Sequence, residues 1–239
     1  MASCGIDKSR LEAFSDGVLA VVITLLVLDL HVDPTAPETL GAQVAHEWPS
    51  FAAYAVSFFV VGVIWVNHHA LFALVSGADR SMLFVNLLLL MFVTAIPFTT
   101  ASLSGFLTRA DGSATTAVLL YGAAMEGMAL SFTLLLARMA RSGLTVRPVG
   151  REEARRAVRR FGFGALIYPV VTAIGLLSPV AMLVLYALLT GYYVREQTPI
   201  LGAAETHATQ SEAAHTESAH TEAAHTEAAH TDSPPGLSA

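Results

Sequence analysis

The stretch that decides the fold is Arg10–Leu30, which reads RLEAFSDGVLAVVITLLVLDL. Between Asp16 and Asp29 lie twelve uncharged and mostly apolar residues. As a helix they cover about 18 Å of a hydrocarbon layer that is about 30 Å thick, so both aspartates fall at membrane depth. Ionisable groups at that depth are costly and normally face the interior of a bundle or a water-filled path. We therefore expect this helix to line something polar rather than to anchor the chain in lipid.

The composition of the whole chain is that of an integral membrane protein. Hydrophobic residues make up 54% of the 239 residues, charged residues only 13%, and the mean hydropathy is +0.58, which exceeds the usual values for soluble domains. Five more apolar segments follow the first one. They are Phe51–Val75, Met82–Leu103, Ala114–Met139, Phe161–Leu177 and Val180–Val194. The predicted fold class is all-α, a polytopic membrane protein with six transmembrane helices. Pro169 predicts a kink in the fifth, and Ser178-Pro179 a tight turn before the sixth.

The basic residues predict the orientation of the spans. If the N-terminus is cytoplasmic, twelve of the thirteen lysines and arginines lie inside and only Arg109 lies outside, as the positive-inside rule requires. The first outer loop, Val32–Pro49, contains acidic residues but no Lys or Arg. This gives the outer side a mildly acidic mouth that favours cations. We expect both termini to be cytoplasmic.

The chain becomes polar and repetitive after residue 200. A five-residue repeat, HTESA-HTEAA-HTEAA-HTDSP, starts at His215, and it offers nothing that could be buried. We therefore divide the chain into a six-helix membrane domain, residues 1–200, and a disordered cytoplasmic tail, residues 201–239. The histidines of the tail could bind a transition metal loosely or sense pH, but a solvated tail without a dedicated site is the simpler interpretation.

Two separated motifs resemble those of a known family. The first, R-x-x-x-F-S-D-G, is formed by Arg10, Phe14, Ser15, Asp16 and Gly17; the second, W-x-N-H-H, is formed by Trp65, Asn67, His68 and His69. Together they resemble the transmembrane protein 175 family of potassium channels, in its bacterial type with a single six-helix repeat, over about residues 8 to 195. The resemblance implies a potassium-selective cation channel, with potassium as the permeant ion. It also implies a homotetramer in the bacterial cell membrane, whose first helices line the central pore.

One face of the first helix carries the candidate pore residues. Val21, Leu25 and Leu28 recur at helical spacing with Thr24 beside them, whereas Asp16, Leu19 and Ile23 lie on the opposite face. In isolation such a stripe is more often ordinary helix packing. The resemblance implies that it is the hydrophobic constriction of the pore. The sequence has no TVGYG filter, so selectivity by a cage of backbone carbonyls is not expected.

The polar residues of the first three spans predict a structural layer. Asp16, near the inner end of the first span, lies at about the depth of Asn67, His68 and Asn86 in the next two. Because a bilayer offers no water to satisfy such groups, we expect hydrogen bonds among them, with Arg10 capping the layer from the cytoplasm. The resemblance adds Phe14, Ser15 and Trp65 to this network. Glu126, halfway along the fourth span, has no partner that the sequence identifies.

Other function classes are less well supported. His68 and His69 point about 100° apart on a helix and cannot easily share one metal ion. The sequence contains no nucleophile with a plausible base and no nucleic-acid motif, so we expect no metal, no cofactor, no enzyme activity and no nucleic-acid partner. The alternative function is a secondary cation or proton-coupled transporter, and an intramembrane enzyme is the third class. Transporters more often show inverted repeats with interrupted helices, which are not evident here.

Overall fold

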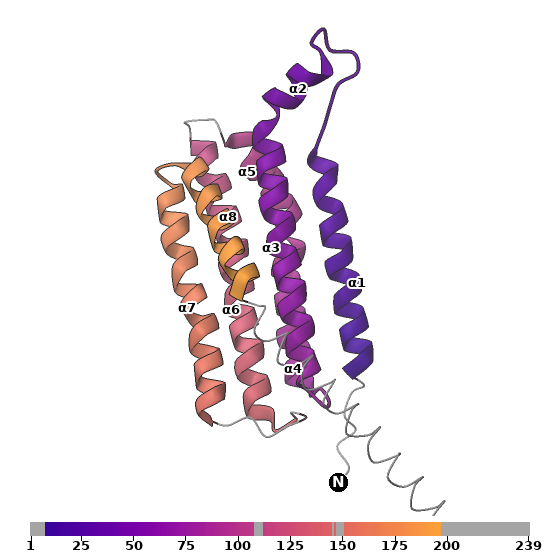
Figure 1. Ribbon diagram of the computed structural model, residues 1–239, viewed down its shortest axis with the longest axis vertical. Coiled ribbons are helices and arrows are strands. Elements are labelled where there is room, and N and C mark those ends of the chain that lie inside the picture. Colours follow the sequence, from indigo (N-terminus) through magenta and orange to yellow (C-terminus); the bar gives the residue numbers. More distant parts are fainter. Residues whose placement is uncertain (1–7, 108–111, 145, 147–150, 197–239) are drawn as a thin grey trace, which may run out of the picture. The chain divides into compact units, whose positions relative to one another are not determined.

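The computed structural model describes residues 8–107, 112–144, 146 and 151–196, and the ordered elements among them are helices (Figure 1). In chain order they are α1 (Lys8–Leu26), the 3₁₀ helix η1 (Val27–Asp29), α2 (Leu40–His46), α3 (Trp48–Ala73), α4 (Arg80–Thr94), α5 (Ile96–Phe106), α6 (Gly112–Ser142), α7 (Arg151–Gly175) and α8 (Pro179–Glu196). Contacts divide the chain into a helical unit, residues 1–194, and a second unit, residues 195–239. The predicted tail, 201–239, lies outside the described residues.

Within the described residues, four segments are long and apolar enough to cross a membrane: Lys8–Asp29, Trp48–Ala73, Arg80–Phe106 and Gly112–Ser142. The apolar parts of the last two helices, Gly162–Gly175 and Pro179–Arg195, are shorter. The chain is therefore all-helical with at least four candidate spans, and the six-span count stays a prediction. Helix α7 begins at Arg151, ten residues before the predicted start at Phe161. The arginine-rich segment is thus helical too, because hydropathy marks membrane depth and not where a helix begins.

The third predicted span is two helices rather than one. Helix α4 ends at Thr94 and α5 begins at Ile96, so the span predicted over Met82–Leu103 is interrupted at Ala95, although Arg80–Phe106 as a whole is long and apolar enough to cross a membrane. Pro97 occupies the first turn of α5, where its missing N–H costs nothing. The chain resumes the helical pattern when Thr99 N donates to the carbonyl of Ala95 at 3.0 Å.

The loop between α1 and α3, which is predicted to be the first outer loop, contains a short helix, α2, that was not expected from the sequence. Thr39 caps it, because its side chain accepts a hydrogen bond from Ala42 N at 3.3 Å. Asp33 Oδ1 accepts hydrogen bonds from the hydroxyl and the backbone N–H of Thr35. These bonds lower the pKa of Asp33 below its usual value, so the loop between α1 and α3 carries this negative charge at neutral pH.

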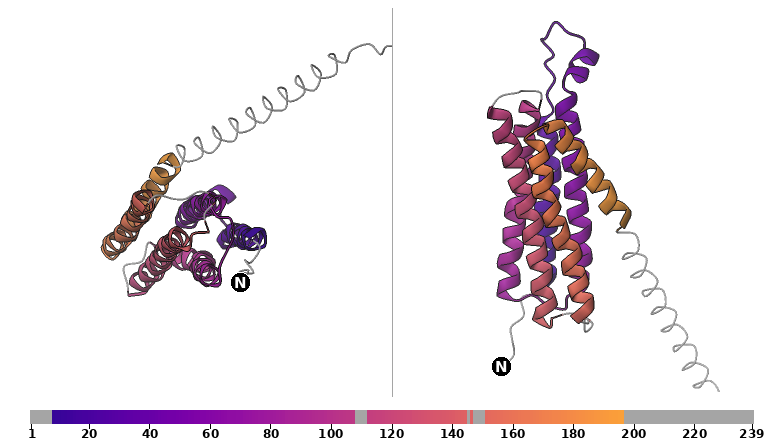
Figure 2. Two further views of the ribbon diagram at one scale, coloured as in Figure 1. Left: turned by 90° about the horizontal axis from the view of Figure 1, so that it is seen from below. Right: turned by 90° about the vertical axis from the view of Figure 1, so that its left-hand side faces the viewer.

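Helix α1 lies at the edge of the bundle, against α3, α4 and α5 (Figure 2). Helix α6 is the central packing element, since it contacts α4, α5 and α7. Two glycines let its neighbours approach closely. A Cβ at Gly127 would overlap the ring of Phe92 in α4, and one at Gly122 would overlap Thr172 in α7. Helix α4, which packs against α1, is therefore held in place by tight packing on α6.

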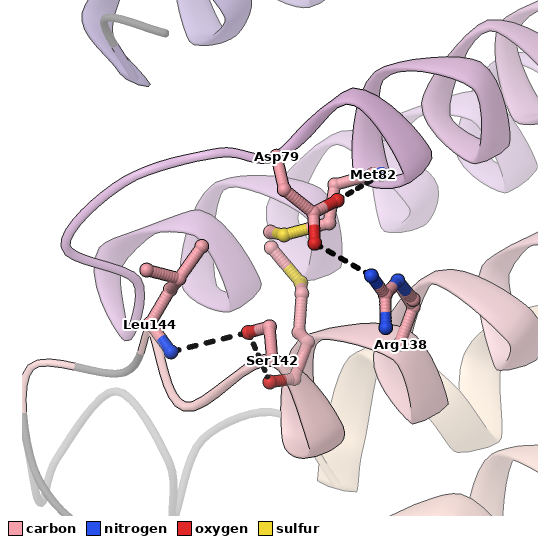
Figure 3. A network of polar contacts seen from close by, with 6 residues as sticks. Asp79, Met82, Arg138, Ser142 and Leu144 are labelled. Atoms are coloured by element: carbon pink, nitrogen blue, oxygen red, sulfur yellow. Dashed lines mark hydrogen bonds and ion pairs between the residues drawn. The ribbon is translucent and has the colours of Figure 1, made fainter. Parts of the chain in front are cut away.

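A polar clasp joins the start of α4 to the end of α6 (Figure 3). Asp79 Oδ1 accepts a hydrogen bond from Met82 N at 2.8 Å, which caps α4, and its Oδ2 lies 2.7 Å from Arg138 Nη2. Beside it, Ser76 N donates to the carbonyl of Leu144 at 2.8 Å. These contacts fix the turn between α3 and α4 against α6, at the end of the bundle where α1 begins (Figure 1).

Candidate functional site

The two faces of α1 differ sharply in exposure. Leu19, Val22 and Leu26 are each 1% exposed and pack in the core. The predicted pore residues on the other face are open: Val21 is 55%, Leu25 43% and Leu28 65% exposed. Since α1 stands at the edge of the bundle (Figure 2), this apolar stripe faces away from the helices of its own chain.

The end of this helix places two residues of the stripe, Leu25 and Leu28, on its exposed face. The α-helix ends at Leu26 rather than continuing to Leu30, and Leu28 belongs to η1. Leu28 follows Leu25 by three residues, and both side chains are exposed. Thr24 is exposed beside them, and its hydroxyl donates to the carbonyl of Val21 at 2.8 Å. Its oxygen lone pairs stay open on this face.

A buried chain of hydrogen bonds joins α1 to α3 and α4. His68 Nε2 lies 2.9 Å from Asn86 Oδ1, and Asn86 Nδ2 donates to Ser15 Oγ at 2.9 Å. All three side chains are 0% exposed. Because Asn86 Oδ1 can only accept, this arrangement assigns the proton to His68 Nε2. The Ser15 hydroxyl in turn donates to the carbonyl of Leu11, which ends this series of hydrogen bonds.

A second set of polar contacts joins α1 to α3 closer to the surface. Trp65 Nε1 donates to Asp16 Oδ1 at 3.0 Å, and His69 Nδ1 lies 3.3 Å from Glu12 Oε1. The Trp65 and His69 rings stack with centroids 6.3 Å apart. Glu12 is not among the predicted network residues. The spacing could have identified it. Glu12 and Asp16 are four residues apart, as are Trp65 and His69, so the two residues of one helix can each meet one of the other when the helices run antiparallel.

The remaining predicted network residues are placed differently from expectation. Asn67 Nδ2 donates to the carbonyl of Val63 in its own helix. Arg10 is exposed, and within the described ranges it forms no salt bridge that would cap Asp16. Phe14 is 53% exposed. The structure thus separates the expected single layer into the buried chain at Ser15 and the outer contact at Asp16.

Two other acidic residues in the spans have different surroundings. Ser104 Oγ of α5 donates to Asp29 Oδ2 at 2.9 Å, so α1 is tied to the bundle at its far end as well. Glu126 Oε2 is buried, and no residue in the described part of the chain hydrogen-bonds to it. The described residues also include no group of three His, Cys, Asp or Glu side chains that could hold a metal ion.

Comparisons with known proteins agree on one family. The model of the family described as "Endosomal/lysosomal potassium channel TMEM175" matches residues 10–97, the segment that carries both sets of polar contacts. A protein of Streptomyces collinus named as a potassium channel is 42% identical over 196 residues, which are 81% of this chain and 95% of that protein. The chain belongs to the TMEM175 family.

Two further matches come from Chamaesiphon minutus. A protein named as a potassium channel is 36% identical over 72% of this chain and 86% of its own length. The crystal structure of a homologue described as a lysosomal potassium-selective TMEM175 channel is similar with a TM-score of 0.70 and 34% identity. The match covers 80% of this chain and 97% of that one. The TMEM175 likeness therefore extends over about four fifths of the chain, although the family model itself ends at the first turn of α5.

Proposed function

We propose that this chain forms a potassium-selective cation channel in a bacterial cell membrane, as a homotetramer whose α1 helices line a central pore. The observation that carries the proposal is the exposed apolar stripe on α1, in a chain that covers 95% of a relative named as a potassium channel. One copy of α1 cannot enclose a path. A pore made by this helix needs several copies around an axis, which closed cyclic symmetry provides.

The stripe supplies the physical barrier of the proposed pore. A ring of Leu25 and Leu28 side chains from each copy offers a hydrated cation no replacement ligands, so it stops ions by dewetting when narrow and passes them when widened. Thr24, one step around the helix, adds hydroxyl oxygens next to this ring. The hydrogen bonds of Ser15 and Asp16 to α3 and α4 have the complementary role of fixing the orientation of α1 about its own axis.

The charge distribution supports the proposed orientation. Arg80 at the start of α4 and Arg141 in the last turn of α6 lie at the end of the bundle where α1 begins (Figure 1). The opposite end carries the acidic loop of α2. By the positive-inside rule the arginine-rich end is cytoplasmic, which makes the acidic loop the outer mouth. Its anions concentrate cations there.

Reconstitution tests the proposed function directly. Purified protein in planar bilayers with potassium on one side and sodium on the other should show discrete current steps and a reversal potential shifted toward that of potassium. Native mass spectrometry should give four chains per particle. Flux without unitary steps, at the turnover of a carrier, would favour the transporter alternative instead.

A pair of variants tests which face of α1 lines the pore. Leu28→Ala should widen and wet the constriction, which raises the current and relaxes the preference for potassium over sodium. Ile23→Ala, on the side that packs against the core, should change stability and leave permeation as it is. If Ile23→Ala alters selectivity and Leu28→Ala does not, the pore face has been assigned to the wrong side of α1.

A further inference from the structure

A cavity of about 60 Å³ lies among α3, α6, α7 and α8, away from α1. A water-sized group needs about 10–15 Å³ of such space, so the cavity accepts roughly four to six such groups. Its walls include Ile64 of α3, Ala129 and Phe132 of α6, and Tyr168 of α7. It is partly open to the outside of the bundle. This is enough room for a short length of hydrocarbon chain.

Most of the cavity wall is hydrocarbon, and one polar group on it, the buried hydroxyl of Tyr186, forms no hydrogen bond with the described residues. Two polar residues of the wall donate hydrogen bonds to carbonyls of their own helices. Asn67 Nδ2 donates to the carbonyl of Val63, and Thr190 Oγ1 donates to the carbonyl of Tyr186 at 2.7 Å. The rings of Tyr168 and Tyr186 stack with centroids 5.7 Å apart and form a rigid aromatic side. A largely apolar cavity favours an apolar guest.

The cavity lies at the membrane depth of the first methylenes, next to the headgroup, of an acyl chain in the cytoplasmic leaflet. Gly164, which lines the cavity, follows the exposed side chains of Arg155, Arg156 and Arg159 in the same helix. At a rise of 1.5 Å per residue, Arg159 and Gly164 are about 7.5 Å apart along α7. Phosphate at the level of the arginines therefore places the first methylenes of its lipid at the level of the cavity.

We propose that the cavity binds one acyl chain of an anionic phospholipid from the cytoplasmic leaflet, with its phosphate held by the arginines that begin α7. Charge complementarity selects the anionic lipid, since exposed arginines at that leaflet attract negatively charged headgroups. The proposal needs the chain to lie in a membrane but does not depend on ion conduction. Its failure and the failure of the channel proposal are therefore separate results.

Native mass spectrometry of the full-length protein in mild detergent tests this site. With phosphatidylglycerol or phosphatidylcholine added at equal concentration, phosphatidylglycerol should bind more tightly. Arg159→Gln should lower its affinity about fivefold, the contribution of one basic residue near a leaflet. Ala129→Leu, which fills the cavity, should abolish binding of the tightly held lipid. If Ala129→Leu does not fold, Leu189→Phe, which fills the cavity from α8, is tested in its place.

Matched controls decide the outcome. Arg141→Gln removes an exposed arginine from α6 instead of α7 and should leave lipid binding unchanged. Equal binding of the two lipids, or undiminished binding in the filled variants, would overturn the proposal. So would a chain truncated after Glu196 that binds phosphatidylglycerol when the full chain does not, because the cavity would then be occupied by the protein's own C-terminal residues.

Discussion

Ser15→Ala removes the end of the buried polar chain that holds α1 in place. The Ser15 hydroxyl accepts the hydrogen bond of Asn86 Nδ2 at 2.9 Å, and both side chains are 0% exposed. Without it this N–H is buried and unpaired, which costs about 1–3 kcal/mol. Hydrogen bonds between membrane helices measure about 0.6 kcal/mol on average, but the full burial of Asn86 raises the expected cost above that average. The variant should thus unfold about 5- to 150-fold more readily, since each 1.4 kcal/mol is a factor of ten.

Ser131→Ala is the matched control for this prediction. Ser131 is 2% exposed and its hydroxyl donates to the carbonyl four residues earlier, as that of Ser15 does. It belongs to α6, however, and it does not accept the hydrogen bond of Asn86, which goes to Ser15. We expect it to change stability by less than about 0.5 kcal/mol. Equilibrium unfolding in mixed micelles, followed by tryptophan fluorescence, compares the two. Equal losses in both variants would refute the role of the chain in tethering α1.

Other contacts give further predictions. Trp65→Phe removes the hydrogen bond to the half-exposed Asp16 and should cost about 0.5–1.5 kcal/mol in the same unfolding assay. Asp79→Ala should cost about 1 kcal/mol for the cap of α4 and a further 0.2–1 kcal/mol, roughly, for the partly exposed pair with Arg138; if Arg138→Gln costs as much, the cap contributes nothing. Removal of residues 202–239 should leave the oligomer mass and the conductance unchanged, and a truncated chain that does not assemble would contradict the division into domains.

The sequence predicted the helical class and most segments of the chain because apolar length is a strong signal. Its errors arise where local chemistry decides. Pro97 sits at a permitted position of a new helix, so the third span breaks at Ala95, and Thr39 starts α2 in a loop that composition described only as acidic. These boundaries depend on single backbone hydrogen bonds, which hydropathy does not register.

The candidate site was predictable in its residues but not in its partners. The 3.6-residue period places Val21 and Leu28 opposite Leu19, and the structure exposes the first two and buries the third. Whether they line a pore stays a prediction. Membrane depth places Asp16 and His68 at one level. Depth does not determine whether two side chains at that level point toward each other. That depends on the rotation of the helices, so Ser15 rather than Asp16 meets the buried Asn86.

Access of a thiol reagent to α1 tests the central claim most directly. The chain has a single cysteine, so Cys4→Ser gives a clean background for Leu28→Cys and for Leu188→Cys on α8. Both leucines are 65% exposed in the single chain and differ only in the helix that bears them. A charged, membrane-impermeant methanethiosulfonate should reduce the potassium current through Leu28→Cys and leave Leu188→Cys unaffected. If the current through Leu28→Cys is unchanged, or if only Leu188→Cys is blocked, α1 does not line the pore.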